Sequence, residues 1–113
     1  MTDPDAIAQI NPEEAEQLRQ KGAVLLDVRE PSEWAEGHAP GAEHLPLGTL
    51  EGSPTSYGGK TVLVICRSGA RSLRASQSLI ARGVDARNVT GGMNAWAACG
   101  LPVVRDDSAT ITA

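Results

Sequence analysis

The sequence has few aromatic residues: two tryptophans, one tyrosine and no phenylalanine. Binding of nucleic acid relies on a basic surface and on aromatic side chains that stack on bases, whereas the formal net charge here is −4. We therefore expect no nucleic-acid partner. No apolar run approaches the roughly 20 residues that cross a bilayer, and the first ten residues carry acids where a secretory signal carries bases. We expect a cytoplasmic protein with no membrane partner.

Cysteine and histidine are also scarce. The two cysteines, Cys66 and Cys99, are far apart in the sequence, and a reducing compartment disfavours a disulfide between them. His38 and His44 do not combine with these cysteines into a recognisable zinc-ligand spacing. The sequence therefore implies no metal and no other cofactor.

The overall composition is that of a compact globular protein. Hydrophobic residues make up 41% of the 113-residue chain and charged residues 21%. We expect a single domain over residues 1–104 and a flexible tail over residues 105–113. Charge is uneven: residues 1–60 hold 11 acidic and 4 basic residues, whereas residues 61–113 hold 3 acidic and 6 basic ones. A local anion site can therefore exist within an acidic protein.

Short apolar runs alternate with helical patterns along the chain. Asn11, Pro12 and Glu14 form the signature of a capped helix start, and Gly22 ends that helix. Strands are predicted over residues 23–28, 42–47, 61–65 and 86–89. Further helices are predicted over residues 31–37, over residues 72–82 and around Trp96. The glycine-rich residues 48–60 predict a loop.

This alternation predicts the fold class. Strands that alternate with helices at such spacings form parallel βαβ units, so we expect an α/β sandwich with helices on both faces of the sheet. Ligands of parallel sheets bind beyond the carboxyl ends of the strands. Asp27 and Cys66 each come at the end of a predicted strand. We therefore expect both residues at the functional edge.

The stretch CRSGARS, residues 66–72, joins a predicted strand to a predicted helix. If its backbone amides turn inward, they form a nest of donors at a helix N-terminus, which favours an anion. Such surroundings lower the pKa of a thiol from about 8.5 and make it a nucleophile. A cysteine at a strand end is often only a small buried apolar residue, but that role needs no flanking arginines. We predict a reactive Cys66 and a binding loop formed by Arg67, Ser68, Gly69, Ala70, Arg71 and Ser72.

Asp27 and Arg29 lie two residues apart at the end of the first long predicted strand. They are candidates for a supporting role at the site. A simple ion pair at a strand end is an equally good interpretation of the same two residues.

Three segments of the chain resemble the motifs of single-domain rhodaneses, the thiosulfate sulfurtransferase-like family. They are LLDVREPSEWAEGHAPGA at residues 25–42, VICRSGARS at residues 64–72 and GGMNAWAACGLPV at residues 91–103. The resemblance implies a rhodanese-like three-layer α/β/α sandwich around a central, mostly parallel sheet of about five strands. Ala39 stands where many members carry isoleucine or valine.

The resemblance also implies an activity. Cys66 accepts a sulfane sulfur from thiosulfate or a similar donor as a persulfide, and passes it to cyanide or a thiol acceptor. In that scheme the loop amides hold the persulfide, Arg71 orients the anionic donor and Arg67 assists at the entrance. Asp27 and Arg29 match the first-motif pair and support the site.

Two alternatives stay open. Some rhodanese-like domains have lost the cysteine and act only in binding, so a sulfur-carrier or regulatory domain that accepts a protein partner is one alternative. Related phosphatases and arsenate reductases are the other, and they place the loop arginine six positions after the cysteine. Arg71 stands five positions after Cys66, and Ser72 occupies the sixth. The shorter loop resembles the sulfur-binding version.

Overall fold

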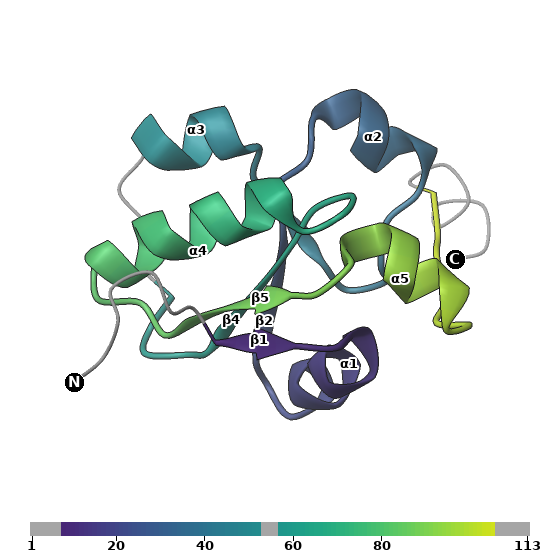
Figure 1. Cartoon of the computed structure of the whole chain (residues 1–113), viewed down its shortest axis with the longest axis horizontal. Helices are drawn as coiled ribbons and strands as arrows, with labels where there is room; N and C mark the ends of the chain where they lie inside the picture. The colour runs from purple at the N-terminus through teal and green to yellow at the C-terminus, as the bar shows by residue number, and fades with distance from the viewer. Residues whose placement is uncertain (1–7, 53–56, 106–113) are drawn as a thin grey trace.

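The computed structural model describes residues 8–52 and 57–105 as five strands and five helices (Figure 1). The strands are β1 (Gln9–Ile10), β2 (Val24–Asp27), β3 (Glu43–His44), β4 (Val62–Ile65) and β5 (Ala86–Val89). The helices are α1 (Pro12–Gln20), α2 (Pro31–Glu36), α3 (Leu47–Gly52), α4 (Ala70–Ala81) and α5 (Gly92–Ala98). Over these two described ranges no helix has the length and apolar character needed to cross a membrane.

The five strands form one sheet in the order β1-β5-β4-β2-β3, and each neighbouring pair is parallel. β4 lies at the centre, and all four of its residues are buried, as expected for a parallel strand covered on both faces. Asp27 at the end of β2 is paired in register with Ile65 at the end of β4. The predicted α/β class with a central parallel sheet is confirmed.

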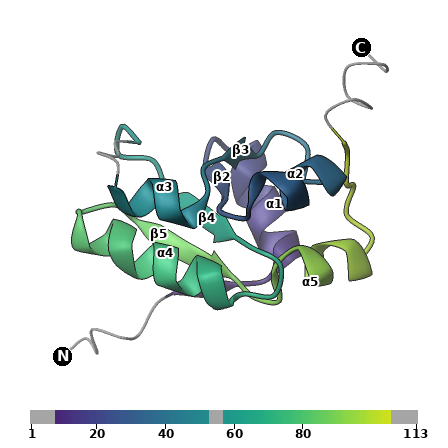
Figure 2. The same cartoon turned by 90° about the horizontal axis from the view of Figure 1, so that it is seen from above.

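Side chains that alternate along the strands divide the core into two apolar layers. On one face Leu26, Val62 and Val64 pack against α3 and α4. On the other face Leu25, Leu63 and Ile65 pack against α1 and α5, and Trp96 of α5 is fully buried there. Figures 1 and 2 show α3 and α4 on the side of the sheet opposite α1. The molecule is thus the expected three-layer sandwich.

The predicted start of α1 is also present. The side-chain oxygen of Asn11 accepts a hydrogen bond from the Glu14 amide at 2.8 Å, and the Glu14 carboxylate accepts one from the Asn11 amide at 3.1 Å. Two otherwise unpaired backbone donors are satisfied by this reciprocal arrangement. α1 therefore begins at Pro12, and Asn11 alone separates it from β1.

The structure corrects the sequence-based prediction in two places. Residues 48–60 were expected to form a loop, but α3 occupies Leu47–Gly52; residues 53–56 lie outside the described range. Leu50 of α3 is fully buried in the layer that contains α4, and this tertiary contact outweighs the glycines on either side. The short edge strand β1 was not predicted. Of the predicted tail, residues 106–113 lie outside the described residues.

Leu50 provides a test of this correction. We expect Leu50→Ala to lower the free energy of unfolding by about 2–5 kcal/mol, because the substitution leaves a cavity where a fully buried side chain packs. Ile80→Ala is the control, since Ile80 is 42% exposed, and we expect a loss below about 1 kcal/mol. Urea denaturation measures both. Equal losses for the two variants would show that α3 does not contribute to the core.

Candidate active site

Cys66 and Asp27 meet at the edge predicted for them. Cys66 follows β4 directly, and Asp27 ends the neighbouring strand β2. Because both strands run in the same direction, their carboxyl ends open toward the same side of the sheet. The loop from Cys66 to Gly69 leads from this edge into α4, which begins at Ala70.

The Cys66 thiol is held inside its own loop. The Gly69 amide donates a hydrogen bond to Cys66 Sγ at 3.1 Å, and the Ser72 hydroxyl lies 3.3 Å from the same sulfur. Gly69 adopts φ +115°, a conformation that favours glycine. Cys66 is only 1% exposed. The loop therefore surrounds the sulfur with polar donors rather than with apolar side chains alone.

These donors decide the ionisation of the thiol. Burial by itself raises the pKa of Cys66, because a thiolate loses its hydration. The Ser72 hydroxyl and the backbone amides of Ser72, Gly69 and Ser68 outweigh burial, and the pKa of Cys66 is lowered from its ordinary value. The lowered pKa makes the thiolate, which is the reactive form of cysteine, more accessible than it is for a free cysteine.

The first turn of α5 is hydrogen-bonded to the backbone of the loop. The Met93 amide donates to the Cys66 carbonyl at 2.7 Å, and the Asn94 amide donates to the Arg67 carbonyl at 3.0 Å. Gly92 has φ +56°, and a Cβ atom at this position would collide with the Cys66 carbonyl and the Arg67 backbone. The glycine therefore allows the first turn of α5 to lie directly against the loop. This role was not predicted, although two adjacent glycines before a helix are a visible signal.

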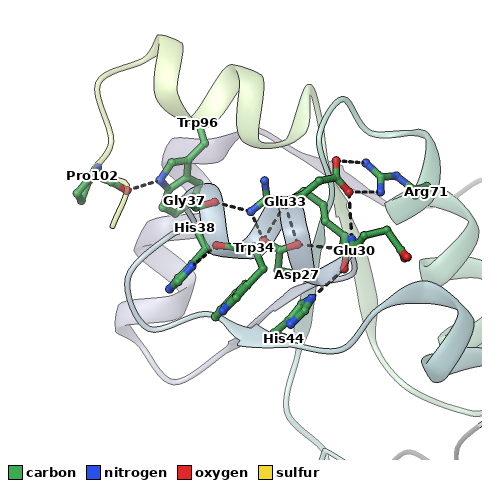
Figure 3. A network of polar contacts seen from close by, with 11 residues as sticks. Asp27, Glu30, Glu33, Trp34, Gly37, His38, His44, Arg71, Trp96 and Pro102 are labelled. Atoms are coloured by element: carbon green, nitrogen blue, oxygen red, sulfur yellow. Dashed lines mark hydrogen bonds and ion pairs between the residues drawn. The ribbon is translucent and has the colours of Figure 1, made fainter. Parts of the chain in front are cut away.

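The Arg71 side chain is not free in the loop, because it forms an ion pair with Glu33 of α2 (Figure 3). Its Nη1 and Nη2 atoms donate to the two carboxylate oxygens at 2.6 and 2.8 Å. The hydrogen bonds from Arg71 lower the pKa of Glu33 to about 2, so the carboxylate stays charged at neutral pH. Glu33 was missed by the sequence analysis, because nothing in its own segment indicates a partner 38 residues away.

Asp27 and Arg29 form a buried ion pair. Arg29 Nε and Nη2 donate to the Asp27 carboxylate at 2.8–3.0 Å, and Nη2 also donates to the Gly37 carbonyl at 2.7 Å. Asp27 is fully buried and Arg29 is 6% exposed. The pair therefore connects the end of β2 to the end of α2. The structure contains the ion pair between Asp27 and Arg29. Their supporting role at the site stays a prediction.

Aromatic stacking fixes the same segment from its other side. The ring of Trp34 stacks on His38 at 3.5 Å and on His44 at 4.7 Å between centroids. Figure 3 shows the indole of Trp34 between the two imidazoles. Since His44 belongs to β3, the stack joins α2 to the edge of the sheet. Glu33 is thereby held in place to meet Arg71.

A pocket of about 250 Å³ lies beside the loop, between α2 and α5. Arg67 contributes from the loop itself and is exposed, with no ion pair to any residue of the described ranges. The buried Arg29 also lines the pocket. The complete lining consists of Arg29, Glu33, Glu36, Gly37, Arg67, Met93, Asn94, Ala97 and Val103. The pocket thus combines basic, acidic and apolar side chains next to the residue that follows Cys66.

The predicted site residues therefore separate into groups. Cys66, Gly69 and Ser72 meet at the sulfur, and the Ser68 amide also acts on it, although Ser68 is exposed. Ala70 is exposed and begins α4. Arg67 faces the pocket. Among residues 8–52 and 57–105 no cluster of three or more histidine, cysteine or acidic side chains could hold a metal ion.

Cys66 lies between the central parallel strand and a helix, and its sulfur accepts a backbone hydrogen bond. This arrangement places the chain among the α/β proteins that have a cysteine-centred loop. The chain belongs to the rhodanese-like domain family, whose sequence model matches residues 11–99. This membership supports a sulfurtransferase type of function at the level of the family.

Individual relatives agree with this assignment. An uncharacterised protein of Synechocystis, slr1261, is 42% identical over 106 residues, which is 91% of this chain and 59% of that protein. The chain thus spans less than two thirds of that relative. A rhodanese-related protein of Thermoplasma volcanium superposes with a TM-score of 0.79 at 32% identity, over 86% of this chain and 97% of the other. A Rhodopseudomonas palustris protein described as a possible tyrosine phosphatase superposes with a TM-score of 0.77 at 27% identity. The match covers 87% of this chain and 85% of that protein.

The buried ion pair generates a prediction about stability. We expect Asp27→Asn to lower the free energy of unfolding by about 3–5 kcal/mol, because it leaves the Arg29 guanidinium buried without its counter-charge. The matched control is Asp85→Asn, whose partner Arg87 is 3.5 Å away in an exposed pair, and we expect a loss below about 1 kcal/mol. Thermal and urea unfolding measure the difference. A loss at Asp27 no larger than the loss at Asp85 contradicts a structural role for the buried pair.

Proposed function

We propose that this protein is a sulfurtransferase that moves a sulfane sulfur from thiosulfate, or a donor like it, to a thiol or cyanide acceptor. The observation that carries the proposal is the thiol of Cys66, which is buried and yet held by the Gly69 amide and the Ser72 hydroxyl. Donors in that position stabilise negative charge on sulfur. They suit both a thiolate and the terminal sulfur of a persulfide.

The first half-reaction loads the enzyme. The Cys66 thiolate attacks the outer sulfur of thiosulfate, a new S–S bond forms, and the bond between the two sulfurs of thiosulfate breaks. Sulfite leaves with the electron pair of that bond, and Cys66 becomes a persulfide anion. The lowered pKa of Cys66 makes the thiolate available for this attack without a neighbouring general base.

The second half-reaction unloads the enzyme. Cyanide or a thiolate attacks the terminal sulfur of the persulfide and leaves as thiocyanate or as a new persulfide. The electron pair of the broken S–S bond returns to Cys66 as the thiolate. Donor and acceptor thus react in turn with one cysteine, which predicts double-displacement kinetics.

The loop argues against a phosphatase or an arsenate reductase. The residue six positions after Cys66 is Ser72 and not an arginine. Its hydroxyl lies 3.3 Å from the sulfur. Arg71 is five positions after Cys66 and is engaged by Glu33 of α2. A tetrahedral oxyanion needs a wider ring of donors with an arginine that faces it. The arrangement therefore favours a single sulfur atom as the bound group.

A protein acceptor is consistent with the same chemistry. The pocket beside Arg67 opens to solvent and is lined by charged and apolar groups, so a thiol carried on a protein surface can approach the loop.

We propose a single domain over residues 1–104 in a reducing compartment such as the cytoplasm, where Cys66 stays a free thiol. A domain that captures a partner without turnover is the alternative that the loading experiment distinguishes.

Intact-mass spectrometry tests the proposal directly. We expect thiosulfate to add the mass of one sulfur atom to the protein and cyanide to remove it, because a persulfide is the required intermediate. Cys66→Ser abolishes the gain, and Cys99→Ser keeps it, since Cys99 lies at the end of α5 outside the loop. A gain that survives in Cys66→Ser, or no gain in any of these proteins, contradicts sulfur transfer through Cys66.

Arg67 provides a second test. We expect Arg67→Ala to raise the KM for thiosulfate about fivefold at low salt with little change in kcat, because an exposed cation near the loop attracts the anionic donor. The control is Arg74→Ala, which removes another exposed arginine, 70% exposed and paired with Glu51 on α3, and leaves KM unchanged. Steady-state kinetics at two salt concentrations measure both variants. Equal effects of the two substitutions would mean that only the net charge of the protein matters.

A further inference from the structure

Asn88 is a buried polar residue for which the proposed reaction has no use. It lies in β5 with 4% of its surface exposed, paired in register with Val64 of β4 on one side and Gln9 of β1 on the other. Burial of a side-chain amide is costly unless its donors and acceptors find partners. Ser72 and Gln9 are those partners: the Ser72 hydroxyl lies 2.5 Å from Asn88 Oδ1, and Asn88 Nδ2 lies 2.8 Å from Gln9 Oε1.

These contacts form a continuous chain from the surface to the nucleophile. Gln9 is exposed on the edge strand β1, Asn88 is buried in β5, and Ser72 is buried on α4. The Ser72 hydroxyl then lies 3.3 Å from Cys66 Sγ. Three segments far apart in the sequence therefore meet in one line of hydrogen bonds that ends at the sulfur.

The hydroxyl of Ser72 has a single proton, and three acceptors surround it. They are Cys66 Sγ, the Gly69 carbonyl at 3.2 Å and Asn88 Oδ1. A hydroxyl that gives its proton to Asn88 cannot donate it to a thiolate. When Asn88 presents Oδ1, that oxygen competes with the thiolate for the proton, and when it presents Nδ2, only the sulfur and the Gly69 carbonyl remain as acceptors.

The chain has two self-consistent directions. With a neutral thiol, Cys66 donates to Ser72 Oγ, Ser72 donates to Asn88 Oδ1, and Asn88 Nδ2 donates to Gln9 Oε1. With a thiolate, Ser72 donates to Sγ, so Asn88 must turn its amide by 180° and donate to Ser72 Oγ. Gln9 then turns as well and donates to Asn88 Oδ1. A side-chain amide is suited to both directions, because its two ends have nearly the same shape.

We propose that Asn88 is a positioning residue, which turns the Ser72 hydroxyl toward Cys66 Sγ when the thiolate forms and away from it when the thiol is neutral. No atom of Asn88 touches the sulfur, so its effect passes through Ser72. The inference deepens the proposed function, because it concerns the same thiolate. It is nevertheless testable without any sulfur donor.

Charged groups around the loop act separately from this chain. Arg71 of α4 interacts electrostatically with Cys66, and its charge is compensated by Glu33 of α2. In the described part of the molecule the side chain of Asn88 is hydrogen-bonded to Ser72 and Gln9 and to no charged side chain. The charged groups of the loop and of the elements packed around it include Arg67, Arg71 and Arg74 of the loop and α4, Asp27 and Arg29 at the end of β2, Glu30, Glu33 and Glu36 of the α2 segment, Glu51 of α3, and Asp85 and Arg87 at β5. A neutral substitution at Asn88 thus leaves the charges in place and changes the hydrogen bonding.

The test is the pH dependence of alkylation of Cys66 by iodoacetamide, in a Cys99→Ser background that leaves one thiol. We expect Asn88→Leu to raise the midpoint by about one pH unit, because no donor then holds Ser72 Oγ and its proton can turn to the Gly69 carbonyl, so that the thiolate loses much of a hydrogen bond. Ser72→Ala raises it by a similar amount. The double variant Ser72→Ala with Asn88→Leu shows no further rise than Ser72→Ala alone, since Asn88 acts only through Ser72. A purely structural role for Asn88 predicts additive shifts.

The control is Thr90→Val. Thr90 follows β5 and its hydroxyl donates to the Ile10 carbonyl of β1, so it lies near the same strands without contacting Ser72. We expect its midpoint to equal that of the parent protein. A folded Asn88→Leu variant with the parent midpoint overturns the proposal, and so does an additive double variant.

Asn88→Asp keeps the test decisive if the leucine variant does not fold. An ionised carboxylate of the same shape can only accept, so it holds the Ser72 proton and adds a negative charge. We expect a larger rise in midpoint than in Asn88→Leu, and an unchanged midpoint overturns the proposal. Failure of thiosulfate to load Cys66 would refute sulfur transfer while the alkylation midpoints still judge the role of Asn88.

Discussion

The candidate active site depends on the hydrogen bonds made to one buried sulfur atom. Cys66 comes at the end of the central strand β4, where both faces of the sheet are covered and water is excluded. A charge at such a place is unfavourable unless nearby donors replace its hydration. The loop supplies them through the Gly69 amide and the Ser72 hydroxyl. The first turn of α5 then holds the loop carbonyls, which is possible because Gly92 has no side chain.

The cations near this sulfur have different surroundings. Arg29 is buried against Asp27 and the end of α2, and Arg71 is held by Glu33, so both connect elements of the fold. Arg67 alone among these three is exposed beside the pocket. Arginines that looked equivalent as neighbours of one motif therefore differ in what they are able to do. An anionic substrate meets Arg67 with its charge available, whereas it has to compete with Glu33 for Arg71.

Much of the fold was predictable because its signals are local. The capping pattern at Asn11 and Glu14 and the apolar run of β4 each identify an element from a few adjacent residues. The loop assigned to residues 48–60 was wrong at its start, because the burial of Leu50 against the layer of α4 stabilises α3 despite Gly48 and Gly52. β1 was missed since two residues carry no period, and only the neighbouring β5 makes them a strand.

The sequence by itself determined the position of the thiol at a strand end, its loop and the alternation of strands and helices, since spacing along the chain encodes all three. Only the tertiary structure decided which groups surround the thiol. Glu33 reaches Arg71 across 38 residues, Asn88 reaches Ser72 across 16 and Gln9 reaches Asn88 across 79. Such pairs depend on which strands become neighbours and on which face each side chain lies. Those choices follow from burial of the whole core and leave no trace in the local pattern.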